Sequence, residues 1–311
     1  MRLSVIIPTH NPNEQRLQRT LDGLRTQTFS VAQWELLIVD NASSPAVGLQ
    51  TLGVPSGPAV RIIHEPKLGL TSARKTGLHE SHGEIIVFVD DDNVLAPDYL
   101  EQVCVAFARQ PKVGALGGKS LPEFSVPVAT DDWRREFFPL LALRDLGDNE
   151  LVSRGLRPFG HSVNAYPIFA PIGAGLALRR EAAQSWLASP DRGLTDRHGQ
   201  ELSSAGDNDI VFHIMQAGWE VAYIPSLSLT HLIPPNRVDA AYLARLNRGI
   251  QKSWMQVLSL HHANPWPPLS STSSRLRQLK AWMTYRAWSN SAAHIRWQGA
   301  CGHFEGRAAK R

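Results

Sequence analysis

Cysteine is scarce in this chain of 311 residues, which has only Cys104 and Cys301. Two cysteines can build neither a disulfide framework nor a four-cysteine zinc site, so a reducing compartment is expected. Long apolar runs are absent too, because no stretch approaches the roughly 20 apolar residues of a transmembrane helix. The opening run stops at Pro8, which is too early for the apolar region of a signal peptide. We therefore expect a cytoplasmic protein that at most lies on the inner face of a membrane.

The glycine motifs of common nucleotide-binding proteins are also missing. The first apolar run ends in PTHNP, and neither G-x-G-x-x-G nor G-x-x-x-x-G-K-[ST] follows it. This argues against a dinucleotide oxidoreductase and a P-loop NTPase. The glycine-rich, Arg-containing loop of a sugar-phosphate nucleotidyltransferase is not present at this place either.

Acidic residues are almost missing from the last quarter of the chain. Residues 236–311 hold 12 Lys and Arg against 2 acidic residues, a local net charge of +10, whereas residues 1–235 have a net charge of −6. The chain is therefore expected to have an acidic body and a basic tail, whose charges either lie in water or meet an anionic surface. No nucleic-acid recognition motif accompanies the charge, so we expect no nucleic acid as a partner.

Short apolar runs rich in β-branched residues alternate with helix-like segments in the first part of the chain. Four runs are almost continuously apolar, as strands covered on both faces should be: residues 3–9, 34–40, 60–65 and 84–90. A strand that leads into a short helix is also expected over residues 168–181. A further helix is expected over 207–220, and it leads into a strand over 221–231. The alternation predicts an α/β fold with a mostly parallel central sheet.

Three carboxylates follow the fourth run, in the sequence VFVDDDN. Asp90, Asp91 and Asp92 would lie at the carboxyl end of a parallel strand, where open α/β sheets bind ligands. Oxygen ligands at this place suit Mg²⁺ or Mn²⁺, which can neutralise a diphosphate. A solvated acidic turn is an equally good interpretation of these three residues alone.

Polar residues at two further places have two interpretations each. Asp40 ends the second run, where it could accept hydrogen bonds from a nucleotide or cap the following turn. Lys67 and Arg74 lie in KLGLTSARKTGL, before the fourth run. Arg74 could reach a phosphate, or it could be an exposed helical arginine.

The order of these motifs resembles that of family 2 glycosyltransferases, which have the GT-A fold. The resemblance covers residues 1–235 and rests on six pieces in order: VIIPTHN, LLIVDNAS, GLTSARKTGL, FVDDDN, GAGLALRR and AGDNDI. It implies a GT-A catalytic domain over 1–235, followed by a basic helical extension over 236–311.

The resemblance also assigns site residues. It implies that the nucleotide-sugar donor is bound by a set of residues from several motifs: Pro8, Thr9, His10, Asp40, Lys67, Arg74, Asp90, Asp91, Gly173 and Gly175. Asp90 and Asp92 match the two acids of the D-x-D motif, with Asp92 as the direct metal ligand. His231 matches a histidine that ligates the metal in some relatives, although a hydrogen-bonded, non-ligand histidine fits as well.

The catalytic base is implied by AGDNDI, which resembles the later acidic motif of the family. Aligning Asp209 with the last acid places Asp207 on the base, with Gly206 where an acid is common. The structural alternative for Asp207 is a helix N-cap. Lys75 also departs from the family, which usually has Asn there.

These assignments imply an inverting, metal-assisted glycosyltransferase. The donor would be a nucleotide sugar such as a UDP- or GDP-sugar, and the acceptor a glycan or a lipid-linked glycan of a cell-surface polysaccharide or glycolipid. The Q-x-x-R-W signature of processive synthases is missing, because Ala293 stands three residues before Arg296. The alternative function is a non-catalytic nucleotide-sugar-binding or scaffold protein at a membrane surface.

Residues 242–258 predict the clearest amphipathic helix in the chain. Its apolar residues fall on one face, opposite Arg245, Arg248 and Lys252: Leu243, Leu246, Ile250, Trp254 and Val257. This helix either packs on the catalytic domain or lies on an anionic membrane near a lipid-linked acceptor. Residues 265–274 predict a linker, and the basic, Trp-rich residues 275–288 predict a helix with poorly segregated apolar residues.

Overall fold

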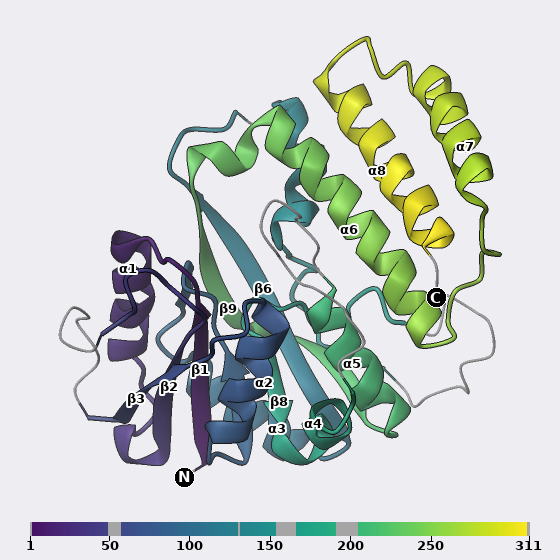
Figure 1. The fold of residues 1–311 in the computed structure, drawn as a ribbon. Helices are drawn as coiled ribbons and strands as arrows, with labels where there is room; N and C mark the ends of the chain where they lie inside the picture. Colours follow the sequence, from purple (N-terminus) through teal and green to yellow (C-terminus); the bar gives the residue numbers. More distant parts are fainter. Residues whose placement is uncertain (1, 49–56, 130, 154–165, 191–204, 310–311) are drawn as a thin grey trace.

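A computed structural model describes residues 2–48, 57–129, 131–153, 166–190 and 205–309. Within these residues a nine-stranded mixed sheet has the strand order β3-β2-β1-β4-β8-β6-β9-β5, and β7 pairs with β9. Helices lie against the sheet, and the helices at the C-terminal end of the described chain form a group at one side (Figure 1). The α/β class and the predominantly parallel first half agree with the expectation from the sequence.

The first half of the sheet is made of four parallel strands: β1 (Leu3–Thr9), β2 (Trp34–Asp40), β3 (Ala59–His64) and β4 (Ile85–Phe88). Helix α1 (Glu14–Arg25) follows β1, and α2 (Leu70–Glu80) connects β3 to β4. Strands β1, β2 and β4 are buried along their whole length, as their continuous apolar runs predict. The prediction was wrong for β3, which is half-exposed because it forms an edge of the sheet.

The second half of the sheet is built on two long parallel strands, β6 (Val113–Phe124) and β9 (Glu220–Ile233). The short β8 (Ala177–Arg179) runs antiparallel between β4 and β6, and β5 (Asn93–Leu95) runs antiparallel to β9. Strand β7 (Leu151–Val152) is shorter still. The strand expected within residues 168–181 is β8, and it is only three residues long. Prolines and glycines before it prevent a longer ladder of backbone hydrogen bonds.

The remaining helices of this region connect or follow the strands. They are α3 (Tyr99–Arg109), α4 (Arg180–Leu187) and α5 (Gly206–Gln216), with the 3₁₀ segments η1 (Val31–Gln33), η3 (Trp133–Leu141) and η5 (Pro235–Val238). Alternate residues of β1 enter two apolar cores: Val5 and Ile7 lie in one, and Ile6 lies in the other. The sheet is thus covered on both faces, and open sheets of this kind bind ligands at the carboxyl ends of their strands.

Three helices close the described chain: α6 (Ala240–Leu260), α7 (Ser271–Thr284) and α8 (Ser291–Ala308). Helix α6 lies between the body of the protein and α8, and α7 is outermost (Figure 1). Apolar residues of α6 pack on both neighbours. Leu243 shares a core with Phe137 of η3 and Ile295 of α8, and Val257 shares another with Phe212 of α5.

This position corrects the membrane interpretation of the helix over 242–258. Its apolar face is filled by protein, and its basic face is partly covered as well. Arg248 forms an ion pair with Glu305 of α8, and Gly302 of α8 lies against the backbone of Arg248 so closely that a Cβ atom would meet its carbonyl oxygen at 2.0 Å. Helix α6 is therefore a packed helix. Among the described residues, no helix is long and apolar enough to cross a bilayer.

Candidate active site

The carboxyl ends of β1, β2 and β4 open into one cleft with a volume of about 260 Å³. It is lined by polar side chains from segments far apart in the sequence: Thr9, His10, Asn11, Asn13, Arg16, Asn41, Asp90, Asp91, Asp92 and Arg237. Pro8 and Gly69 also line it. The cleft therefore contains six of the residues that the family resemblance indicates: Pro8, Thr9, His10, Asp90, Asp91 and Asp92.

Asp91, the middle acid of the triplet, is bonded to the end of β1. The hydroxyl of Thr9 donates to Oδ2 of Asp91. Burial, and then the negative charge of Asp92, raises the pKa of Asp91 to about 6. The triplet is therefore a place of concentrated negative charge, which a cation would stabilise.

Asp92 is buried and has partners from the end of β9 and the segment after it. Nη2 of Arg237 lies 3.1 Å from Oδ2 of Asp92, and Nε2 of His231 lies 3.4 Å from Oδ1. Nδ2 of Asn93 donates to the same Oδ1 at 2.9 Å. The structure thus brings His231 to the acids, as the resemblance implies, and adds Arg237.

The donor set of this cleft fits a divalent cation. Three carboxylates supply the oxygen ligands that Mg²⁺ and Mn²⁺ prefer, and an imidazole would add to the preference for Mn²⁺. Nδ1 of His231 is buried and makes no hydrogen bond. Burial, and then repulsion from the neighbouring carboxylates, raises the pKa of Asp91, and a bound cation would relieve that repulsion.

A continuous series of contacts joins the triplet to Asp207. Nη2 of the buried Arg74 donates to Oδ1 of Asp90 at 3.4 Å. The same guanidinium lies against Gly173, where a Cβ atom would come within 2.7 Å of Nη2. The backbone N–H of Gly173 then donates to Oδ2 of Asp207 at 2.8 Å. Four segments that are distant in the sequence therefore meet at one place.

Asp207 lies in the first turn of α5 and is half-buried. Its Oδ1 accepts a hydrogen bond from the backbone N–H of Asn208 at 2.9 Å. The N-cap residue of α5 is Ala205, so Asp207 is inside the helix and is not its N-cap. The N-terminal turn of a helix stabilises negative charge, and these hydrogen bonds fix the carboxylate in one orientation.

Asp40 and Lys67 do not line the cleft. Asp40 is buried, and its carboxylate accepts hydrogen bonds from the backbone N–H groups of Ser43 and Val47 at 3.2 and 3.1 Å. Burial acts to raise the pKa of Asp40, but these bonds and those from the Ser43 hydroxyl and His64 outweigh it and lower the pKa. Asp40 therefore shapes the loop after β2. Lys67 is exposed beside the cleft, and contact of either residue with a donor stays a prediction.

Gly175 is placed by backbone geometry. Its φ is +71°, a left-handed conformation that favours glycine, and a Cβ atom there would lie 2.5 Å from the hydroxyl of Tyr99. That hydroxyl donates to the carbonyl of Gly175 at 2.6 Å. The structure explains this glycine by packing against Tyr99, and a contact with the donor sugar stays a prediction.

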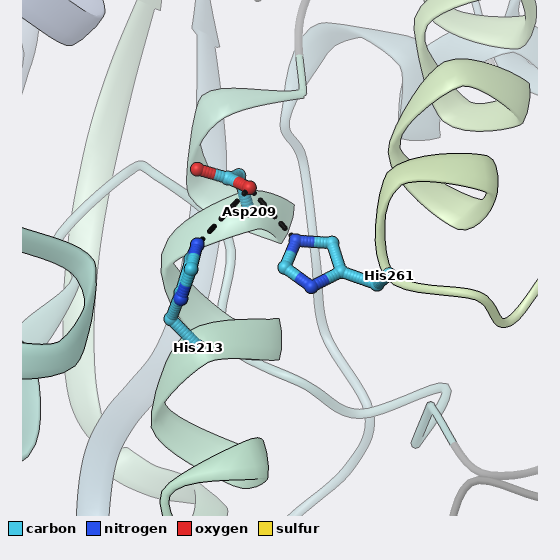
Figure 2. A group of neighbouring side chains, drawn as sticks. All are labelled: Asp209, His213 and His261. Atoms are coloured by element: carbon cyan, nitrogen blue, oxygen red, sulfur yellow. Dashed lines mark hydrogen bonds and ion pairs between the residues drawn. The ribbon is translucent and has the colours of Figure 1, made fainter. Parts of the chain in front are cut away.

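Asp209 lies two residues after Asp207 and belongs to a different, buried cluster (Figure 2). Its Oδ1 lies 2.8 Å from Nε2 of His261, and its Oδ2 accepts a hydrogen bond from Nε1 of Trp186 at 2.9 Å. His213 lies one turn further along α5, with its Nε2 3.8 Å from Oδ1. Burial opposes ionisation, but the hydrogen bond from His261 and the positive charges nearby lower the pKa of Asp209.

The cluster of Asp209, His213 and His261 has the residue types of a metal site. Its hydrogen bonds already satisfy both oxygens of Asp209, and Nδ1 of His261 lies 3.1 Å from Oε1 of Gln216. These bonds account for the cluster without a metal, as a hydrogen-bond network that holds α5 against the end of α6. Asp209 is also a poorer candidate for the base than the half-buried Asp207, because it is buried and bonded to the side chains of His261 and Trp186.

Sequence reasoning missed several polar residues that line the cleft, and Asn41 and Arg237 are the two with contacts that shape it. Asn41 holds the loop before α2: its Nδ2 donates to the carbonyls of Glu65 and Lys67, and its Oδ1 accepts from Gly69. Arg237 lies in η5, in the part of the chain expected to be the extension. Asn41 directly follows Asp40, so its place after a strand was a usable signal. No sequence pattern indicates Arg237, because its contact with Asp92 depends on the path of β9.

Comparisons with known proteins give one consistent result. Residues 4–186 match Glycosyl transferase family 2. The glycosyltransferase AglE of Haloferax volcanii is 32% identical over 129 residues, which is 40% of this chain and 40% of that protein. The chain spans between 13% and 40% of the length of four curated relatives that include AglE.

Solved structures show the same fold at low sequence identity. The mannosyltransferase PcManGT of Pyrobaculum calidifontis, in complex with GDP-Man and Mn²⁺, superposes with a TM-score of 0.57 at 19% identity and covers 96% of this chain and 85% of that one. Residues 1–349 of TarS from S. aureus superpose with a TM-score of 0.54 at 12% identity, covering 99% and 90% of the two chains. The family match, the GT-A fold and the acid triplet at the end of β4 agree, and the chain belongs to glycosyl transferase family 2.

Proposed function

We propose that this protein transfers a sugar from a nucleotide-sugar donor to an acceptor hydroxyl, with inversion at the anomeric carbon. The observation that carries the proposal is the series of contacts from Asp90 through Arg74 and Gly173 to Asp207. It links an acid triplet suited to a cation and diphosphate with a single oriented carboxylate suited to take a proton.

Each group has a role that follows from its place. The donor diphosphate would lie in the cleft, where Arg237 supplies a guanidinium that can bind phosphate oxygens. Mg²⁺ or Mn²⁺ held by Asp90 and Asp92, with His231 as a further ligand, would supply Lewis-acid stabilisation of the leaving diphosphate. Asp207 would take the proton of the acceptor hydroxyl on its carboxylate. One base and one displacement imply inversion.

The donor and acceptor are proposed at the level of chemical class. A UDP- or GDP-sugar is the donor class, since a related TarS structure contains UDP and the PcManGT structure contains GDP-Man and Mn²⁺. The acceptor class is a glycan or a lipid-linked glycan of the cell surface. Transfer would be non-processive, because the chain lacks the synthase signature before Trp297.

The test is a screen of UDP- and GDP-sugars with Mn²⁺, following nucleoside diphosphate release with and without a pool of glycan and lipid-linked acceptors. Acceptor-dependent release that is lost in Asp207→Asn supports the proposal. Donor binding by thermal shift without any release, over the whole screen, would instead favour the non-catalytic nucleotide-sugar-binding protein.

A further inference from the structure

Helix α7 presents large apolar side chains to solvent. Leu276, Leu279 and Met283 are 64%, 57% and 54% exposed. Trp282, Tyr285 and Trp288 are exposed beside them or just after the helix. These six residues are close to half of all exposed large apolar residues in the part of the chain that the structure describes. Scattered apolar residues need no explanation, but a contiguous group of this kind indicates an interaction site.

The exposed residues form one stripe on the helix. Leu276, Leu279 and Met283 have the spacing i, i+3, i+7, which places them on a common face. The opposite face packs on α8: Ser274 and Ala281 are buried, and Nε1 of Trp297 donates to the carbonyl of Gln278. The stripe therefore points away from the protein, and α7 is the outermost helix in Figure 1.

Basic side chains border this stripe. Arg275, Arg277, Lys280 and Arg286 are all exposed, and helical spacing puts Arg275 on one side of the stripe and Arg277 and Lys280 on the other. No Asp or Glu occurs between residues 240 and 304. An apolar stripe bordered by cations on both sides is the composition of a helix that lies in a membrane interface.

We propose that the outward face of α7 docks on an anionic lipid bilayer. The apolar stripe would enter the boundary between headgroups and acyl chains, and the basic residues would contact anionic headgroups. Trp282 and Trp288, whose ring centroids are 4.5 Å apart, would lie at the headgroup level that such rings prefer. A symmetric dimer through this face is disfavoured, because it would place two positively charged faces against each other.

This surface differs from the one that the sequence pattern favoured. Helix α6 has the cleaner amphipathic pattern, but its apolar face is covered by η3, α5 and α8. In the sequence of α7, apolar and basic residues are poorly separated. The reason is that only a narrow strip of small residues, with Ser274 and Ala281, packs on α8, whereas the large apolar residues lie outside that strip. Docking through α7 does not depend on the proposed transferase activity.

Co-sedimentation of the full chain with vesicles tests the proposal. Vesicles of phosphatidylcholine with 30% phosphatidylglycerol should bind the protein at low salt, and 0.5 M NaCl should release it. The variant Arg275→Glu, Arg277→Glu, Lys280→Glu should partition at least about 100-fold more weakly, at about 1 kcal/mol for each basic residue. The variant Leu276→Ser, Leu279→Ser, Met283→Ser should also lose binding. A matched control, Arg2→Glu, Arg109→Glu, Lys112→Glu, changes the same charge at exposed positions outside α7 and should bind like the wild type.

A labelling experiment locates the contact without relying on those multiple substitutions. Cys104 and Cys301 are both buried, so Leu279→Cys adds one accessible thiol for an environment-sensitive fluorophore. Anionic vesicles should shift its emission to the blue, and should leave the label on Lys112→Cys unchanged. Absence of binding at low salt, equal binding of the α7 variants, or a shift at both labels would overturn the proposal. A wild-type dimer that the α7 variants abolish, without vesicle binding, would assign the face to a second copy.

Discussion

Nε2 of His261, at the end of α6, lies 2.8 Å from Oδ1 of Asp209, two residues after the proposed base in α5. The imidazole also stacks on Phe212, with ring centroids 4.6 Å apart and planes 10° apart. A residue of the C-terminal helices therefore fixes the helix that carries Asp207. The C-terminal helices are therefore part of the support of the candidate active site.

Replacing His261 should destabilise the protein and lower the transfer rate. His261→Asn removes the stacked ring and leaves Asp209 buried without this partner, at a cost of about 1–3 kcal/mol. Urea unfolding measures this loss, and the same change at the exposed neighbour, His262→Asn, is the matched control. Equal stability of the two variants would show that the pair does not hold the helix.

Asp207→Asn should retain donor affinity but lower kcat by roughly 10²–10⁴-fold, because the amide cannot accept the proton. Its size and its place in the first turn of α5 are kept. Nucleoside diphosphate release gives kcat, and calorimetry gives donor affinity. A variant with normal turnover would contradict the assignment of the base.

The effects of Mn²⁺ or Mg²⁺ on stability and donor binding should require Asp92. Mn²⁺ or Mg²⁺ should raise the Tm of the wild-type protein and strengthen donor binding, and Asp92→Asn should remove both effects together with activity. The control is Asp98→Asn, a change of the same type before α3 and outside the cleft. Full turnover in EDTA is the outcome that contradicts this prediction.

Arg237→Ala should weaken donor binding by roughly 10- to 100-fold, the loss of a charge-assisted hydrogen bond worth about 1.5–3 kcal/mol. Binding of the free nucleoside should change little, because the guanidinium is expected to contact phosphate. Arg19→Ala is the control, since that arginine is exposed and pairs with Glu123. Equal losses for nucleoside and nucleoside diphosphate would remove the phosphate role.

Asp91 should make the chelator-treated protein less stable as pH rises from about 4 to 6. Its pKa is about 6 in the folded chain, against about 3.9 when unfolded. In this window the folded state holds a proton that the unfolded state has released, so the free energy of unfolding falls with rising pH and then levels off. The change is at most about 3 kcal/mol, at 1.36 kcal/mol per pKa unit. Thermal unfolding in EDTA should show a flatter profile for Asp91→Asn, and identical profiles would contradict the shift.

The first half of the fold and the place of the acid triplet could be predicted from the amino-acid sequence alone. β1, β2 and β4 are continuous apolar runs, and a run of this kind folds as a strand buried on both faces. Acids that follow such a strand must lie at the ligand-binding edge of the sheet. The order of six short motifs then indicated the family.

Which side chains meet, and which helix face stays exposed, depends on how distant segments pack together. The contact of Arg237 with Asp92 and that of His261 with Asp209 join residues that no local pattern relates. An amphipathic pattern shows that a helix has an apolar face, but not whether protein covers it. Helix α6 is covered because α8 and the body enclose it, whereas α7 rests on a narrow strip of small residues and keeps its apolar stripe in solvent.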